Sequence, residues 1–383
     1  MTSGIAGRPA TRSRVDRVEA TVMLVTLTVL KVFLAAPERL AREGQTAAWA
    51  VPVISALLSI IWLWPLVSVL NAHPGMDIVQ ITRRVAGGTA AIVTGLFYYC
   101  SVVGLLATGL RQGADAFISV TLPLTPLYFL LGVAYVVVLC VPLWGIESLA
   151  RTSLIGGIYS YSMMALLPIA LLFPNHYANV WNADQVFPLL GPGVIDLLKA
   201  GVMRQSMYFE IFSLGFLAPR LRRRTDAGGV AAMSLGFSVL ALSMVEMGLS
   251  MVFPYPSLRR VPFAYLRATR IVGFGRFFQR LDVAFVANWL VTGLLGAATG
   301  VYVAGLTLVS TFGLGSYKAL LLTVTATIAA LGAYCIPNLG VCVIAEYDIL
   351  RPFATVLLDA LPISLLLLDR MRRKRTARDR VSE

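Results

Sequence analysis

The stretch ATVMLVTLTVLKVFLAAP (residues 20–37) decides the fold class, because its eighteen residues contain a single charged side chain, Lys31. A run of this length crosses the hydrocarbon core of a bilayer as one helix. A basic tail, residues 1–19, precedes the run, as in a signal peptide, but the run is long for the apolar region of such a peptide. We therefore predict a retained first transmembrane helix.

Similar apolar runs continue along the chain. Of its 383 residues 58% are hydrophobic and 13% charged, and the mean hydropathy is +0.79. Soluble domains have about 45–50% apolar and about 25% charged residues, so cytosolic, nuclear and secreted classes are excluded. We predict an all-α polytopic membrane protein with about ten transmembrane helices, near 20–37, 48–70, 88–110, 122–144, 152–173, 194–218, 228–253, 283–311, 318–337 and 352–368.

The net charge of +13 is concentrated in the tails and in short loops, which is typical of the cytoplasmic side of a membrane protein. This distribution predicts that the tails 1–19 and 370–383 are both cytoplasmic, and it argues against a nucleic-acid partner. Six arginines between residues 254 and 282 fall on the predicted outer side. We expect that segment to form helices lying at the interface.

Ten spans divide into two groups of five, 20–173 and 194–369, joined by an external loop at 174–193. An odd number of spans per repeat inverts the second copy. In such transporters an interruption at the same place in each half, here in the first and sixth helices, indicates the binding site. The sixth span here is longer than a bilayer requires.

Enzyme and metal chemistry have little support. The four cysteines show no CxxC spacing, and there are two histidines, so a metal framework is not expected. No P-loop or GxSxG motif is present, and the short glycine pairs at 273–275 and 313–315 follow no predicted strand. We predict a protein that is not an enzyme and has no cofactor.

Several motifs together resemble the endospore germination permeases, the B subunits of nutrient germinant receptors within the amino acid–polyamine–organocation superfamily. The resemblance covers about residues 19–370 and rests on Pro37-Glu38-Arg39-Leu40, Glu43-Gly44-Gln45 with Trp49, Phe187-Pro188-Leu189-Leu190-Gly191, Phe209-Glu210-Ile211, Leu217-Ala218-Pro219, and Pro262 through Arg276-Phe277 and Arg280-Leu281-Asp282 to Trp289. It implies a fold of the leucine-transporter type, with a five-plus-five inverted repeat and broken helices 1 and 6. It also implies a germinant-receptor A subunit and a C-subunit lipoprotein as partners in the spore inner membrane.

The sequence departs from the family at the first helix. The family has glycines just before the Leu-x-x-Pro, whereas residues 30–37 read LKVFLAAP without glycine. Glycine lets a backbone unwind and approach a ligand closely. The usual free-amino-acid pocket is therefore in question.

Charged and polar side chains at membrane depth are the candidate site residues, since an ionisable group inside a bilayer is functional by default. Lys31 either faces a central cavity, pairing with a ligand carboxylate or replacing a coupling sodium, or forms a permanent ion pair with Glu210 or Glu246. Glu210 follows the polar stretch Arg204-Gln205-Ser206, which suits a helix break. The predicted ligand-binding residues are Lys31, Tyr98, Tyr99, Gln205, Ser206, Tyr208, Glu210, Asn288 and Thr292.

Two further features have simpler explanations. Glu246 and Asp359 are expected to be paired or protonated inside the bundle, with a proton pathway as the alternative. Gly296 and Gly300 form a GxxxG motif that predicts close helix packing.

Three functions fit these observations. The preferred hypothesis is a germinant-receptor B subunit that senses a small nutrient, such as an amino acid, in a transporter-like central pocket and triggers germination. The alternatives are a proton-coupled secondary transporter of amino acids or amines and a scaffold subunit that has lost its ligand.

Overall fold

The computed structural model describes residues 14–172, 183–271 and 281–382. Within these ranges every regular element is a helix, and the β contact is an isolated parallel bridge between Val15 and Leu221. The predicted all-α class is confirmed. Six of the described helices are long and apolar enough to cross a membrane, or seven if the bent pair at the first span counts as one. The number of ten spans and the inverted repeat stay predictions.

The first half of the chain forms seven helices and two 3-10 turns. These are α1 (Arg17–Val29), η1 (Leu30–Phe33), α2 (Ala36–Gly44), η2 (Gln45–Ala47), α3 (Ala50–Ala72), α4 (Ile78–Ala86), α5 (Gly88–Val120), α6 (Leu127–Leu143) and α7 (Ile146–Leu172). Helix α4 is short and amphipathic, and its N-cap Asp77 accepts hydrogen bonds from the backbone of Val79 and Gln80.

The second half contains more interruptions. Its elements are η3 (Ala183–Val186), α8 (Val194–Met203), η4 (Gln205–Ser213), α9 (Leu214–Leu217), η5 (Ala218–Arg220), η6 (Arg224–Asp226), α10 (Ala227–Val252), α11 (Tyr255–Leu258), α12 (Ala264–Ile271), α13 (Leu281–Phe312), α14 (Lys318–Ala330), the π-turn η7 (Leu331–Cys335), α15 (Leu339–Ile344), the π-turn η8 (Ala345–Leu350) and α16 (Arg351–Ser382).

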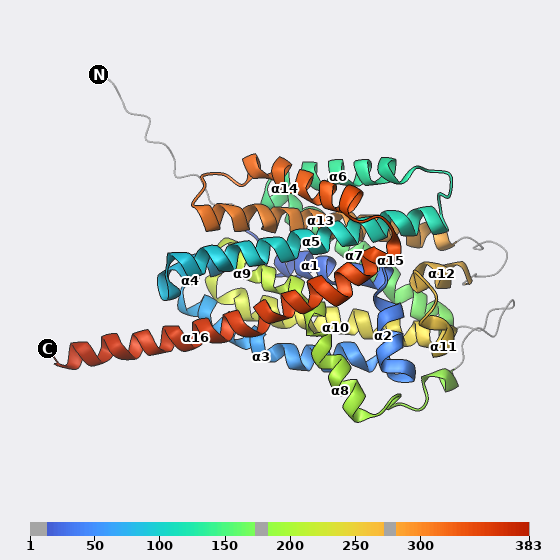
Figure 1. The fold of residues 1–383 in the computed structure, drawn as a ribbon, viewed down its shortest axis with the longest axis horizontal. Coiled ribbons are helices and arrows are strands. Elements are labelled where there is room, and N and C mark those ends of the chain that lie inside the picture. The colour runs from blue at the N-terminus through green and yellow to red at the C-terminus, as the bar shows by residue number, and fades with distance from the viewer. Residues whose placement is uncertain (1–13, 173–182, 272–280, 383) are drawn as a thin grey trace, which may run out of the picture.

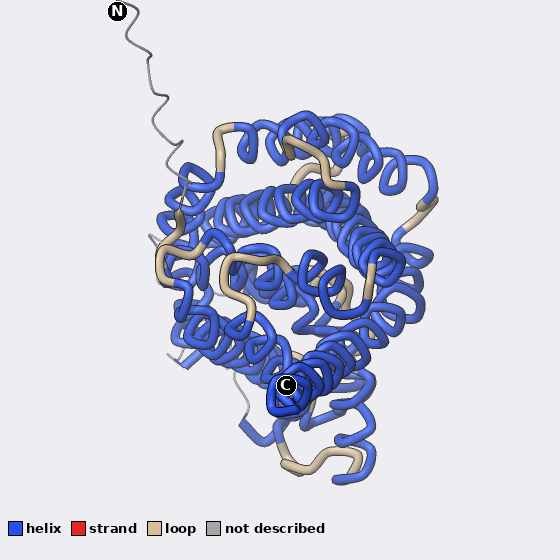
Figure 2. Tube along the Cα trace, turned by 90° about the vertical axis from the view of Figure 1, so that its left-hand side faces the viewer, coloured by secondary structure: helices blue, strands red, loops and turns tan. Residues whose placement is uncertain are grey.

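The long helices run along one axis of the molecule (Figure 1), and the end-on view shows them as a bundle (Figure 2). Helix α1 lies inside this bundle and contacts α7, α10, α13 and η4. Its residues from Met23 to Val25 are at most 1% exposed. The first and sixth spans therefore meet at the centre, where a site between them would lie.

The first helix is broken although it lacks glycine. Leu34 leaves the helical region with φ −103° and ψ −146°. Helix α2 begins at Ala36 with a proline in its first turn, where the fixed φ of proline is favourable. The axis turns by 71° across the break. Pro37 therefore accompanies a change of helix direction that occurs without a glycine at the break.

The sixth span is broken as well. Helix α8 ends at Met203, Arg204 has φ −103° and ψ 10°, and η4 continues for nine residues as a 3-10 helix. Runs of 3-10 helix longer than three or four residues are uncommon and mark functional hinges. Every residue of η4 is buried, so this irregular backbone faces protein and not lipid.

The last span differs from its prediction. It was expected at 352–368, but the helical segment begins at Leu339 and continues through the π-turn η8 into α16. Glu346, Asp348 and Arg351 shortened the apolar window, and the fold accommodates Glu346 and Arg351 by pairing them. The basic residues after 370 extend α16 as far as Ser382 and project from the bundle (Figure 1).

The segment 254–282, which was predicted to lie at the interface, contains α11 and α12, while its residues 272–280, with Arg276, Phe277 and Arg280, lie outside the described residues. So do residues 1–13 of the basic N-terminal tail and 173–182, which include the first nine residues of the predicted external loop. The interfacial and external positions of these segments stay predictions. The GxxxG prediction is confirmed, because a Cβ on Gly296 would lie 3.0 Å from the Thr26 carbonyl oxygen.

Candidate functional site

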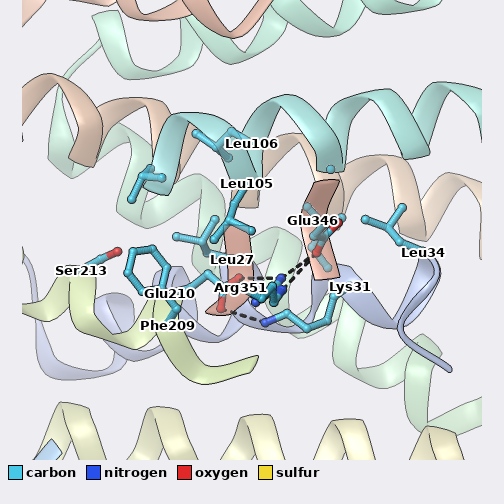
Figure 3. A pocket seen from close by; sticks show the side chains of 13 residues that line it. Leu27, Lys31, Leu34, Leu105, Leu106, Phe209, Glu210, Ser213, Glu346 and Arg351 are labelled. Carbon is cyan, nitrogen blue, oxygen red and sulfur yellow. Dashed lines mark hydrogen bonds and ion pairs between the residues drawn. The ribbon is translucent and has the colours of Figure 1, made fainter. Parts of the chain in front are cut away.

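Four buried charged side chains meet between the two broken helices. Lys31, Glu210, Glu346 and Arg351 are 3%, 9%, 2% and 2% exposed, and they line one cavity (Figure 3). We call these four residues the charge tetrad. Two positive and two negative groups give the tetrad no formal net charge, which is the condition for keeping charges in a low-dielectric interior.

Lys31 links the first broken helix to the sixth. It lies on η1, directly before the break, and its Nζ donates to Glu210 Oε2 at 2.8 Å. The same Nζ donates to the carbonyl oxygen of Met207 in η4. The ammonium therefore binds both a carboxylate and the backbone of the irregular segment, and the predicted ion pair with Glu210 is the one that forms.

Arg351 joins the sixth span to the last one. Its Nη1 and Nη2 each lie 3.3 Å from Glu210 Oε1, and Nη1 donates to the Ser206 carbonyl at 2.7 Å. Its Nη2 and Nε donate to Glu346 Oε1 at 2.8 and 3.2 Å. The π-turn η8 separates Glu346 from Arg351, and its i→i+5 hydrogen-bond pattern brings residues five apart onto one face of the helix.

Gln112 of α5 completes the network. Its Nε2 donates to Glu346 Oε2 at 2.5 Å, and its Oε1 accepts from the backbone N–H of Ala35 at 3.3 Å. That N–H lies at the break of the first helix, where no helical carbonyl is available to it. All four carboxylate oxygens of the tetrad consequently accept a hydrogen bond, and the network connects the first, third, sixth and last spans.

The cavity beside the tetrad is small, with a volume of about 40 Å³. Apart from the tetrad its walls are mainly apolar, formed by Leu27, Leu30, Leu34, Val102, Leu105, Leu106, Gly109, Phe209 and Ser213. A water molecule needs roughly 10–15 Å³ measured in this way. This conformation therefore has room for a few waters and not for a nutrient.

A second group of cations surrounds Tyr347. The guanidinium carbons of Arg39, Arg204 and Arg351 lie 5.6, 5.4 and 5.8 Å from the centre of its buried ring, within the range of cation–π attraction. Arg204 also donates through Nε to Glu43 Oε2 at 2.8 Å. Tyr347 thereby packs the second half of the first span against the sixth and last spans.

Two of the predicted site residues, Lys31 and Glu210, share the cavity. Ser206 contributes its carbonyl oxygen to Arg351, and its hydroxyl is buried without a hydrogen-bond partner, as is Gln205 Oε1. Tyr208 lies on the same segment, but its hydroxyl donates to the Pro52 carbonyl of α3 at 2.8 Å. The predicted residues of the sixth span therefore lie on one segment beside the tetrad, with side chains that point in several directions, and their role in binding a ligand stays a prediction.

The remaining predicted residues do not line the cavity. Tyr98 has its hydroxyl 2.7 Å from Ser213 Oγ, and Tyr99 hydrogen-bonds toward Thr327 of α14. Asn288 and Thr292 face Ser160 of α7, with Thr292 Oγ1 donating to Ser160 Oγ at 2.5 Å. A ligand-binding role for these four side chains stays a prediction.

Three members of the network were missed by sequence reasoning, namely Gln112, Glu346 and Arg351. The available signal was a glutamate and an arginine five residues apart in the apolar stretch 339–368. Intramembrane charges of opposite sign predict a pair, but α-helical geometry separates residues at that spacing, so only the π-turn explains why they meet.

The other intramembrane acids are not part of the tetrad. Glu246 of α10 is 1% exposed, and its Oε1 is buried without a hydrogen-bond partner. Asp359 is half-buried on α16. In the ranges that the structure covers, no group of three or more His, Cys, Asp or Glu side chains is placed to hold a metal ion.

Comparison with solved structures shows the fold of a transporter. The chain is similar to Mhp1, a nucleobase-cation-symport-1 family transporter, in a closed conformation with bromovinylhydantoin bound, with a TM-score of 0.66 and 13% identity over 93% of this chain and 78% of that one. At this identity the likeness concerns the fold alone.

Comparison at the level of sequence gives two results. No curated protein matches the chain. A family described as spore germination protein, the spore permeases, matches residues 14–338. The match covers most of the chain, including the broken helices and Lys31, Glu210 and Gln112, and it ends before Glu346 and Arg351. This chain therefore belongs to the spore germination protein family.

Proposed function

We propose that the protein is the membrane B subunit of a spore nutrient germinant receptor, which senses a small nutrient between its broken helices and triggers germination. Its place would be the spore inner membrane, with both termini cytoplasmic. A germinant-receptor A subunit and a C-subunit lipoprotein would be its partners. Family membership and the transporter fold support this assignment.

The observation that carries the proposal is the neutral charge tetrad at the meeting point of both breaks. Lys31 and Arg351 share Glu210, and Arg351 also binds Glu346. A zwitterion brings one positive and one negative charge, so it can exchange with these pairs and leave no charge uncompensated. An amino acid fits that requirement, whereas a simple anion or cation does not.

A change of ion-pair partners in the tetrad would change the contacts that hold three helices together. Lys31, Glu210 and Arg351 belong to three different spans. A ligand carboxylate on Lys31 and Arg351 would release Glu210, and with it the ion pair between the first and sixth spans. A ligand shifts a conformational equilibrium by its difference in affinity for the two states, and that shift would be the signal to the A subunit.

The test compares wild type with Lys31→Met and the exposed control Lys199→Met, which lies in a surface pair on α8. Purified proteins are screened with the twenty amino acids at millimolar concentration for a rise in unfolding temperature, since stabilisation follows mass action. We expect one or a few amino acids to stabilise wild type and the control, and not Lys31→Met. Spores carrying Lys31→Met should fail to respond to those nutrients.

A scaffold subunit without ligand is the second candidate, because the cavity holds about 40 Å³ and every tetrad carboxylate oxygen is already paired. In that case no amino acid raises the unfolding temperature, yet deletion of the gene abolishes germination. Uptake of labelled amino acid by liposomes that contain this chain alone would instead establish a transporter, and dependence of that uptake on a pH gradient would show that it is proton-coupled.

A further inference from the structure

A second and larger cavity adjoins the one beside the tetrad. It has a volume of about 240 Å³ and is enclosed by α5, the start of α6, the middle of α13 and residues 30 and 34. Leu30, Leu34 and Gly109 line both cavities. The broken segment of the first helix thus separates a charged space from an apolar one.

The walls of the larger cavity contain no charged side chain. All sixteen lining residues are aliphatic, aromatic or glycine, and the one side chain with a hydrogen-bonding group is Trp289. Its indole ring is 4% exposed and stacks on Phe117 with the ring centroids 4.6 Å apart. An apolar space of this kind stays dry, because water finds no partners in it.

Glycine and alanine on the helices keep the space open. A Cβ on Gly113 would lie 3.4 Å from the Trp289 ring, and one on Gly293 would lie 3.1 Å from Leu30. Ala114 and Ala134 contribute the short side chains on α5 and α6. Well-packed interiors contain few voids larger than a water molecule, so an unfilled cavity of this size destabilises the fold.

The cavity opens toward the lipid-facing surface of the bundle. Among its walls Phe129 is 63% exposed, Leu290 41% and Leu122 40%. Phe129 and Leu290 lie on the apolar helices α6 and α13, and Leu122 lies in the connection between α5 and α6. The acyl chains of the bilayer lipids are the most abundant apolar groups at that surface. The cavity is therefore continuous with the protein's established interface, its contact with lipid.

We propose that an acyl chain of a bilayer phospholipid enters this cavity and supports the break in the first helix. The chain would contact Leu30 and Leu34, which also line the cavity beside the tetrad. Lipid composition would then bias the conformation of the same segment that carries Lys31. This site shares Leu30, Leu34 and Gly109 with the cavity beside the tetrad, but its occupation by lipid does not depend on the proposed receptor function.

The test uses quenching of tryptophan fluorescence in nanodiscs of phosphatidylcholine with brominated acyl chains. Subtracting the emission spectrum of Trp289→Phe from that of wild type gives the contribution of Trp289. The same subtraction with Trp64→Phe gives the contribution of Trp64, which is 57% exposed. We expect bromolipid to quench both components, although Trp289 is almost fully buried. An unquenched Trp289 beside a quenched Trp64 would overturn the proposal.

Filling the cavity provides the matched comparison. Ala134→Phe places a ring in the space, whereas Gly132→Phe on the same helix adds one where nothing lies within 4 Å of the new Cβ. We expect Ala134→Phe to protect Trp289 and Gly132→Phe to leave it quenched. Ala114→Leu fills the cavity from α5 if Ala134→Phe does not fold. If bromolipid quenches Trp289 equally in wild type and in the folded variants that fill the cavity, the proposal is contradicted. Quenching by bromobenzene without quenching by bromolipid also contradicts it and would indicate a site for small apolar molecules.

Discussion

Lys31 Nζ lies 2.8 Å from Glu210 Oε2, although 179 residues separate the two in the chain. The pair joins the two helices whose breaks define the site. A buried ion pair contributes little net stability compared with a hydrophobic replacement, but removing one partner leaves an uncompensated charge. The pair is therefore best understood as a lock between two segments that are able to move.

Lys31→Met should destabilise the protein by about 3 kcal/mol, the lower end of the range for breaking a buried pair, because Glu210 keeps Arg351 as a partner. Chemical denaturation in detergent measures the change. Lys199→Met removes an exposed pair, with Lys199 68% exposed, and should stay within about 0.5 kcal/mol of wild type.

The double variant Lys31→Met with Glu210→Met should lose less stability than the sum of the losses in the two single variants. Residues that share one ion-pair network do not contribute additively. Additive losses would mean that the 2.8 Å contact does not couple the two helices.

Arg351→Lys should behave like a loss of the side chain. The guanidinium of Arg351 binds Glu210, Glu346 and the Ser206 carbonyl at the same time. A lysine ammonium is a single point charge without the planar fork, so it cannot reproduce that arrangement. We expect Arg351→Lys and Arg351→Gln to lose nutrient-triggered germination alike.

The control for this prediction is Arg42→Lys. Arg42 is 49% exposed, pairs with Glu38 and donates its Nε to the Arg259 carbonyl, all outside the tetrad, so the germination response should persist. A normal response in Arg351→Lys would show that charge alone, and not the three-way contact, is what the tetrad requires.

Gly296→Ala tests the packing of α13 on α1. The added Cβ would lie 3.0 Å from the Thr26 carbonyl oxygen and 3.2 Å from the Leu27 Cα, and backbone atoms cannot rotate away. Overpacking of this kind costs about 1–3 kcal/mol. Gly236→Ala on α10, where nothing lies within 4 Å, should instead stabilise by about 0.5–1 kcal/mol, and thermal unfolding of both variants measures the contrast.

The sequence predicted the helical class because that depends on a local property: an apolar run of eighteen residues requires a membrane. The break of the first helix was implied by the resemblance to the germination permeases, and that of the sixth by the resemblance together with the polar run 204–206. It also placed Lys31 and Glu210 in one site, because an isolated intramembrane charge requires a partner.

The partners on the third and last spans could not be predicted in the same way. Gln112 is an ordinary polar residue until the fold brings it to Ala35 and Glu346. Arg351 meets Glu346 through a π-turn, which no spacing rule for α-helices anticipates. Tyr98 and Tyr208 show the converse: both lie on the expected spans, but neither lines the cavity, because their hydroxyls bind Ser213 Oγ and the Pro52 carbonyl.

Substitution of Glu246 is expected to raise the free energy of unfolding, whereas substitution of Lys31 is expected to lower it. It is as buried as the tetrad, but its Oε1 has no hydrogen-bond partner. A buried polar group without a partner destabilises by about 1–3 kcal/mol, so Glu246→Leu should raise the free energy of unfolding by a similar amount. Glu210→Leu, which removes the shared partner of Lys31 and Arg351, should lower it.

The germination response of Glu246→Leu then separates the functional alternatives. An acid kept at a cost to stability is typical of a functional group. A variant that is more stable and responds normally to nutrient would place Glu246 outside the mechanism and leave the tetrad as the responsive element. A more stable variant that fails to respond would show that the carboxyl takes part in the conformational change, and it would favour the proton-coupled alternative over a ligand sensor based on the tetrad alone.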